Sequence, residues 1–333
     1  MEKSLVSIVT PCYNTGAYIH RLLDSVLEQT YPNIEMFVVN DGSTDNSADV
    51  ISSYVERFKA RGYSLTLVNQ ENQGQSVAIN RGLQLIKGKY FVWPDSDDFY
   101  ASPDAIERMV TVFERTGDEY GLVRTQENLL EDETLRIIGC NGKNADADCD
   151  KLQLFEDCLF CKNGFFFCPG AYMANFEKMK ACMPLSIYTQ KDAGQNWQLM
   201  LPLLYNYKCY TIQEPLYNVV VRLASHSRGQ YKKFKDVIKK YTAYENTIVE
   251  TIKHINGMPK HECDNYLLEI KRKYCKERLM QSFVYREKAA FNKYYSELSS
   301  IQGINTGVRT LKLLLAFPFV VKCAFYIRRQ LTR

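Results

Sequence analysis

Four apolar runs of strand character alternate with helical patterns along the first hundred residues of this chain. The runs cover residues 5–11, 34–40, 65–68 and 90–93. After the first run, apolar residues recur at helical spacing, at Ile19, Leu22, Leu23, Val26 and Leu27. Alternation of this kind favours an α/β fold, in which a doubly wound, mostly parallel sheet carries helices on both faces.

Three carboxylates follow the fourth run, at Asp95, Asp97 and Asp98. In an open α/β sheet, ligands bind just beyond the carboxyl ends of the strands. Oxygen ligands gathered there suit Mg²⁺ or Mn²⁺, the hard cations that accompany phosphates. The alternative is a polar turn that starts the next helix, because Asp is a frequent turn residue.

Polar loops follow three of the runs, at residues 10–14, 41–43 and 95–98. We expect these loops to meet in one crevice, since parallel strands end at the same edge of a sheet. The first loop, Pro11-Cys-Tyr-Asn-Thr-Gly16, is not the G-x-G-x-x-G of a dinucleotide-binding fold, and no G-x-x-x-x-G-K-[ST] occurs. A phosphate bound in this crevice would therefore have to be met by a metal ion.

Four segments resemble, in order and spacing, those of the family 2 glycosyltransferases. They are Val6-Ser-Ile-Val-Thr-Pro-Cys-Tyr-Asn14, Val38-Val-Asn-Asp-Gly-Ser-Thr-Asp45, Asn72-Gln-Gly74 followed by Ala78-Ile-Asn-Arg-Gly82, and Asp95-Ser-Asp-Asp98. The match covers about residues 4–115, and weaker matches extend to about residue 228. The resemblance implies a GT-A fold, a nucleotide-sugar donor, usually a divalent cation (Mn²⁺ or Mg²⁺), and usually inversion at the anomeric carbon.

The resemblance also implies a role for particular side chains. The implied donor-binding set is Pro11, Tyr13, Asn14, Asp41, Asn72, Gly74, Asp95 and Ser96. Tyr13 would stack on the nucleotide base, and Asp41 would accept a hydrogen bond from a base N–H, which favours uridine. Asp97 would bind the metal, and His226 would complete its shell. The structural alternatives are a loop aromatic at Tyr13, a turn residue and helix cap at Asp41, and a lone surface histidine at His226.

The chain departs from the family pattern where the catalytic base is expected. Gln195 and Asn196 occupy the place of a Glu-Asp pair, and an amide has no useful basicity at neutral pH. We therefore assign the catalytic positions to Asn196 and to Asp192, the nearest upstream carboxylate. Asp192 could equally be a solvated loop residue. Ile79 also stands where many members have an arginine.

The second half of the chain differs in pattern and in charge. Residues 1–227 hold 20 Lys and Arg against 29 Asp and Glu, a balance of −9, whereas residues 228–333 hold 22 against 9, a balance of +13. We divide the chain into a donor-binding and catalytic domain (1–228), a helical extension (229–305) and a basic, apolar segment (306–333). The last segment contains Pro318 and is too short for a transmembrane helix, so it fits an interfacial membrane helix. The alternative is a C-terminal helix docked on its own domain.

Together these features and the resemblance predict a metal-dependent glycosyltransferase, and the resemblance implies a place in cell-surface polysaccharide biosynthesis. Its donor would be a nucleotide sugar, with UDP expected as the nucleotide, and its acceptor a lipid-linked or other glycan; no nucleic acid partner is expected. Two alternatives remain: a nucleotidyltransferase, which would need a basic Gly-rich loop that this chain lacks, and a non-catalytic nucleotide-sugar-binding homologue.

The N-terminus lacks the long apolar core of a signal peptide, so we expect a protein in the cytoplasm, peripheral on the inner face of the plasma membrane. The eleven cysteines would then be free thiols. Cys158 and Cys161 have the spacing of half a zinc site, but no second Cys-x-x-Cys or spaced His pair completes it.

Overall fold

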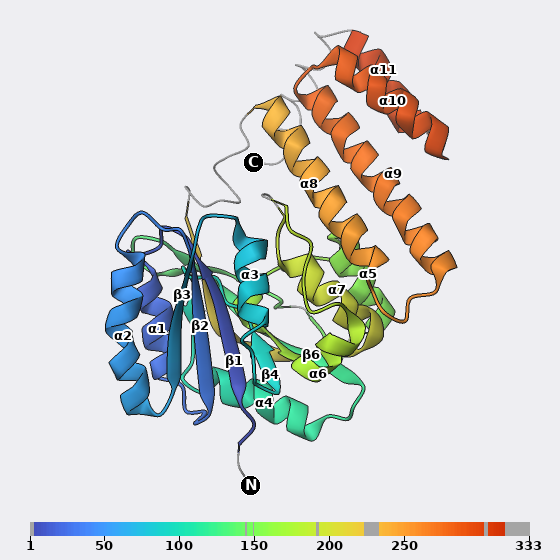
Figure 1. The fold of residues 1–333 in the computed structure, drawn as a ribbon. Helices are drawn as coiled ribbons and strands as arrows, with labels where there is room; N and C mark the ends of the chain where they lie inside the picture. Colours follow the sequence, from blue (N-terminus) through green and yellow to red (C-terminus); the bar gives the residue numbers. More distant parts are fainter. Residues whose placement is uncertain are drawn as a thin grey trace.

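The computed structural model describes residues 3–143, 145–148, 150–190, 193–222, 233–302 and 306–316. Within these residues the strands form one nine-stranded sheet in the order β3-β2-β1-β4-β8-β6-β9-β5, with β7 attached to β6 (Figure 1).

The first half of the sheet is parallel and confirms the doubly wound arrangement. Its strands are β1 (Val6–Cys12), β2 (Ile34–Asp41), β3 (Ser64–Gln70) and β4 (Tyr90–Val92). Every residue of β1, β2 and β4 is buried, because helices cover both faces of these strands. In Figure 1, α1 (Ile19–Leu27) and α2 (Ser47–Arg61) lie together on one side of the strands, and α3 (Gln75–Leu83) lies on the other.

One glycine of the motif segments lets α3 approach the sheet closely. A Cβ atom added to Gly82 would lie 2.1 Å from Val9 Cγ1 of β1. Any side chain at this position would push α3 away from β1, and α3 begins at the loop that closes the predicted donor pocket. Ile79, on the same helix, is fully buried in the core, which explains why it takes no part in the crevice.

The second half of the sheet is mixed. It contains β5 (Phe99–Tyr100), β6 (Tyr120–Glu131), β7 (Ile137–Asn141), β8 (Tyr172–Asn175) and β9 (Lys208–Val221). Strand β8 runs antiparallel to both β4 and β6, whereas β6 and β9 are parallel. Residues 208–212 and 216–221 have the pattern of two strands, but they form the single strand β9, whose register against β6 shifts between Thr125 and Glu127.

The helices that follow β5 pack on this mixed half. They are α4 (Ala105–Arg115), α5 (Lys151–Phe160), the 3-10 turn η1 (Pro169–Ala171), α6 (Phe176–Cys182) and α7 (Asn196–Asn206). Helix α7 is buried from Trp197 to Leu204, and the Trp197 indole N–H donates to the Cys158 carbonyl of α5 at 3.0 Å. The first residues of α7 are thereby held at a fixed place beside the crevice.

The last described part of the chain is helical and extends beside the sheet (Figure 1). Its helices are α8 (Phe234–Lys253), α9 (Lys260–Val284), α10 (Lys288–Gln302) and α11 (Thr306–Ala316). Ile248 and Ile252 of α8 and Ile270 of α9 belong to the main core. The far end of α9 packs with α10 in a separate small core that includes Phe283 and Phe291.

The first turns of α11 dock on this small core. Val308 is buried there, and Lys312 Nζ lies 4.3 Å from the ring centroid of Tyr295. This part of the C-terminal segment therefore follows the docked alternative, while residues 317–333 lie outside the described residues. Among the helices that the structure describes, none has both the length and the hydropathy needed to cross a membrane.

Candidate functional site

The three polar loops meet at the carboxyl ends of β1, β2 and β4, as their positions in the sequence predict. The Asn14 backbone N–H donates to Ser43 Oγ at 3.0 Å, and Asn14 Oδ1 accepts from the Thr44 backbone N–H at 2.8 Å. Thr15 Oγ1 donates to Ser96 Oγ at 3.0 Å. The loop after β1 is thus fastened to the loops after β2 and β4, with Asn14 in the left-handed region at φ 52°.

Asp41 organises a fourth loop, between β3 and α3. Its carboxylate is buried and accepts three hydrogen bonds: from Gln70 Nε2 at 2.7 Å, from the Gln73 backbone N–H at 2.9 Å, and from the Gly74 backbone N–H at 2.8 Å. A carboxylate has about four lone-pair sites, so one acceptor site remains for a base N–H. Asp41 is therefore a structural anchor of the crevice in addition to its predicted role in base recognition.

Asp95 is a half-buried carboxylate flanked by two amides. Its Oδ1 accepts from Gln75 Nε2 at 3.1 Å and from Gln195 Nε2 at 3.3 Å. Burial raises the pKa of Asp95 to about 6, although the hydrogen bonds from Gln75 and Gln195 act in the opposite direction. The two amide hydrogen bonds do not offset the cost of burying this negative charge. A cation or a sugar hydroxyl would therefore be a suitable further partner.

Asp97 forms an ion pair with Arg222, the residue that follows β9. The Arg222 guanidinium also lies over the ring of Tyr18, 4.4 Å from its centroid. Both charged side chains are mostly buried, at 18% and 23% exposure. An internal cation therefore neutralises the predicted metal ligand, and this contact between residues 125 positions apart has no local signal in the sequence.

The amides at the start of α7 also face this region. Gln195 is 1% exposed, and its Oε1 has no hydrogen-bond partner; Asn196 Oδ1 is likewise buried without a partner. Buried acceptors without partners are unusual in folded proteins, and that of Gln195 belongs to the side chain whose Nε2 contacts Asp95. Asp192 and His226 lie outside the described residues.

The remaining predicted donor-binding residues differ in exposure. Tyr13 is 50% exposed, as a stacking platform for a base must be, and Asn72 is exposed as well. Pro11 is buried on β1 opposite Val39. Gly74 has φ 95°, a conformation that favours glycine, and begins α3. Their contacts with a donor remain predictions.

The residues present are compatible with a divalent cation whose coordination shell is completed by phosphate oxygens of the substrate. Such sites use one or two carboxylates together with phosphate oxygens and water, and Asp95 and Asp97 could supply the carboxylates. Among the described residues, no group of three or more His, Cys, Asp or Glu side chains forms a cage for a metal ion. A cation here would depend on the donor's phosphates and on displacement of Arg222 from Asp97.

Comparison with known proteins confirms the family resemblance. Residues 7–139 match the model of the family described as "Glycosyl transferase family 2". EpsH of Bacillus subtilis, which carries the name of a glycosyltransferase, is 39% identical over 126 residues, covering 37% of this chain and 33% of EpsH. TuaG of Bacillus subtilis, named for teichuronic acid biosynthesis, is 34% identical over 157 residues, covering 41% of this chain and 60% of TuaG. The match thus spans a third to three fifths of these relatives' own length.

Solved structures confirm the GT-A fold over nearly the whole chain. Residues 1–349 of S. aureus TarS, in complex with UDP-GlcNAc, superpose with a TM-score of 0.63 at 16% identity, covering 92% of this chain and 83% of that one. The mannosyltransferase PcManGT from Pyrobaculum calidifontis, in complex with GDP-Man and Mn²⁺, gives a TM-score of 0.55 at 15% identity, covering 96% and 81%.

Proposed function

We propose that this protein is a glycosyltransferase that takes a sugar from a UDP-linked donor, with a divalent cation, and transfers it to a glycan or lipid-linked glycan of a cell-surface polysaccharide. The observation that carries the proposal is the crevice in which the loops holding Asp41, Asp95 and Asp97 are fastened together. The family match over residues 7–139 supports it, and so do the nucleotide sugars bound by structures of the same fold.

The proposed reaction is inverting. The acceptor hydroxyl attacks the anomeric carbon on the face opposite the diphosphate, and the bond from that carbon to the diphosphate oxygen breaks. A divalent cation bound beside Asp97 would neutralise charge on the departing diphosphate. Tyr13 would stack on the base, Asp41 would accept a hydrogen bond from a base N–H, and Asp95 would orient the ribose or the cation. The acceptor's proton must pass to a base.

We assign the base to Asp192 because Gln195 and Asn196 cannot accept a proton at neutral pH. The assignment rests on position: Asp192 precedes the turn into α7, whose first residues lie beside Asp95. General-base catalysis contributes typically 10²–10⁴-fold, so Asp192→Asn should slow turnover by that factor with little change in UDP affinity.

A non-catalytic nucleotide-sugar-binding protein is the second candidate, and the Gln195–Asp95 hydrogen bond favours it. The Gln195 amide, which donates to Asp95, occupies the position where the family has its catalytic base. The two functions differ in one measurement: release of UDP from UDP-sugars with Mn²⁺, with and without glycan acceptors. Acceptor-dependent release shows an enzyme, whereas tight UDP binding without release in any combination shows a binding protein.

A thermal-shift panel tests the donor assignment. Ligands that bind the native state raise the melting temperature by mass action, so millimolar UDP, CDP and GDP, each with Mn²⁺ or with EDTA, can be compared directly. We expect the largest shift with UDP and Mn²⁺. A panel without any nucleotide-dependent shift would contradict the proposal.

Replacing Asp41 tests base recognition. In Asp41→Asn, an NH₂ group replaces one of the two carboxylate oxygens. That group would face a donor in either orientation: the Gly74 backbone N–H, or Gln70 Nε2 and the Gln73 backbone N–H. A hydrogen bond to a charged group contributes about 1.5–3 kcal/mol, so we expect a lower melting temperature and at least tenfold weaker UDP binding by calorimetry. Gln70→Ala is the matched control, because it removes one contact of the anchor and keeps the carboxylate. Equal affinity of the unmutated protein for UDP and CDP would refute the base-reading role.

Membrane association through the C-terminal segment also remains a proposal. It rests on the charge balance of +13 over residues 228–333 and on the absence of acidic residues from Gly307 onward. Deletion of residues 317–333 should release the protein from anionic liposomes while UDP binding stays intact. If the shortened protein sediments with the liposomes as the full chain does, residues 317–333 are not the anchor.

A further inference from the structure

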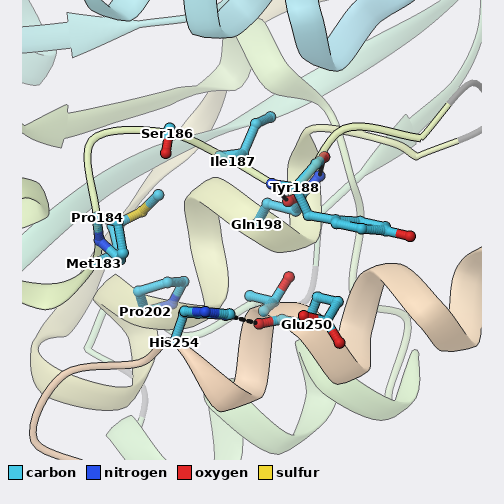
Figure 2. A pocket seen from close by; sticks show the side chains of 10 residues that line it. Met183, Pro184, Ser186, Ile187, Tyr188, Gln198, Pro202, Glu250 and His254 are labelled. Carbon is cyan, nitrogen blue, oxygen red and sulfur yellow. Dashed lines mark hydrogen bonds between the residues drawn. The ribbon is translucent and has the colours of Figure 1, made fainter.

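A pocket lies between the catalytic part of the chain and α8, on the side of α7 next to the loop that joins α6 to α7. Its volume is about 270 Å³. The loop supplies Ser186 and Tyr188, and α7 supplies Gln198 and Pro202. Helix α8 supplies Glu250, and His254 caps its C-terminus (Figure 2). None of these residues belongs to the donor crevice described above.

The wall formed by the loop is held in place by amide side chains from two helices. Asn80 of α3 exchanges two hydrogen bonds with the backbone of Ile187, at 2.9 and 2.7 Å. Gln198 does the same with the backbone of Tyr188, accepting at 2.6 Å and donating at 3.1 Å. An irregular surface loop whose backbone is fixed in this way is preorganised, which is what a binding wall requires.

The lining has the chemistry that recognises a sugar ring. Tyr188 is 36% exposed and supplies an aromatic face, and Pro202 adds apolar surface. The backbone carbonyl of Glu250 can only accept, so the His254 Nδ1 that lies 2.7 Å from it must donate. In the neutral imidazole, Nε2 is then an acceptor for a hydroxyl. Glu250 Oε1 accepts from Lys253 at 2.8 Å, and its carboxylate adds a second acceptor group to the lining.

The pocket and the crevice share helix α7. Gln195, at the N-cap of α7, contacts Asp95 in the crevice, and Gln198, three residues further on, lines the pocket. The volume is slightly below the range of roughly 300–1,000 Å³ that holds larger small molecules, which suits one sugar unit rather than a nucleotide.

We propose that this pocket is an acceptor subsite, in which a sugar unit of the acceptor glycan rests against Tyr188 with its hydroxyls donating to His254 and Glu250. The inference rests on the proposed transferase function. It makes α8 part of the substrate-binding site, so that the helical extension selects the acceptor while the crevice selects the donor.

The test is saturation-transfer NMR with methyl β-glycosides of glucose, galactose and N-acetylglucosamine, on the full chain in the presence of UDP and Mn²⁺. We expect at least one glycoside to give a signal that falls five- to tenfold in Tyr188→Ala and in His254→Ala. Tyr285→Ala is the matched control, because Tyr285 is also 36% exposed but follows α9, outside the pocket lining. UDP affinity should stay within twofold in all three variants.

The outcomes separate the subsite from the proposed function. If UDP binds but no glycoside signal depends on Tyr188 or His254, the subsite is wrong and the transferase proposal stands. If UDP fails to bind to the unmutated protein, the transferase proposal fails first. His254→Gln keeps an acceptor oxygen and should restore part of the signal; loss equal to that in His254→Ala would overturn the assigned hydrogen bond.

Discussion

Asp97→Asn should abolish the Mn²⁺-dependent part of UDP binding while the fold survives. The carboxylate is the predicted anchor for a cation at the donor diphosphate, and a neutral amide cannot replace its charge. In calorimetry we expect the unmutated protein to bind UDP at least a hundredfold more tightly with Mn²⁺ than with EDTA, and the variant to bind equally in both. Identical UDP affinity of the unmutated protein in Mn²⁺ and EDTA would show that no metal acts here.

Two further variants sharpen this result. Asp118→Asn is the control, since Asp118 is fully exposed and lies just before β6 begins, at the sheet edge opposite the crevice. Arg222→Gln should act in the opposite direction and bind Mn²⁺ more tightly, because it removes the internal cation from Asp97. The gain should be roughly tenfold or more, the effect that a neighbouring opposite charge has on a carboxylate's affinity for a proton. Unchanged Mn²⁺ affinity would mean that Arg222 does not compete with the metal.

The sequence predicted those parts of the site that depend on strand ends. The order of strands and helices places the carboxyl ends of β1, β2 and β4 at one edge, so the meeting of their loops follows from the pattern alone. The direction of β8 does not follow, because a strand buried on both faces reads as an apolar run whether it is parallel or antiparallel to its neighbours. The mixed half of the sheet therefore had to come from the structure.

Contacts between segments far apart in the chain could likewise not be predicted from the sequence. Arg222 reaches Asp97 only because β9 runs beside β6 and ends near the loop after β4. Gln195 reaches Asp95 because α7 is fixed by Trp197 against α5. The threefold anchoring by Asp41 did not follow from the sequence, because its partners Gln70, Gln73 and Gly74 lie 29 to 33 residues further along the chain.

Asp95→Asn should stabilise the metal-free protein at neutral pH while it destroys donor binding. The pKa of Asp95 is about 6 in the folded chain, against an ordinary value of about 3.9 for Asp in the unfolded chain. Between these two values the folded state binds the proton that the unfolded state has released, so the free energy of unfolding falls as pH rises from about 4 to 6. Above pH 6 the charged Asp95 costs at most about 3 kcal/mol, because each pKa unit corresponds to about 1.4 kcal/mol and the side chain keeps some contact with solvent.

The asparagine variant escapes this cost and keeps an Oδ1 that can accept from Gln75 and Gln195. In EDTA we therefore expect its melting temperature to exceed that of the unmutated protein by several degrees at pH 8. At pH 5 the gain in stability should shrink to about half of its value at pH 8, because the folded Asp95 is then mostly protonated. A gain of the same size at both pH values, or a loss of stability at pH 8, would contradict the assignment. The expected outcome would mean that this crevice holds a carboxylate that destabilises the empty protein, which is the condition under which a bound cation and donor contribute most to its stability.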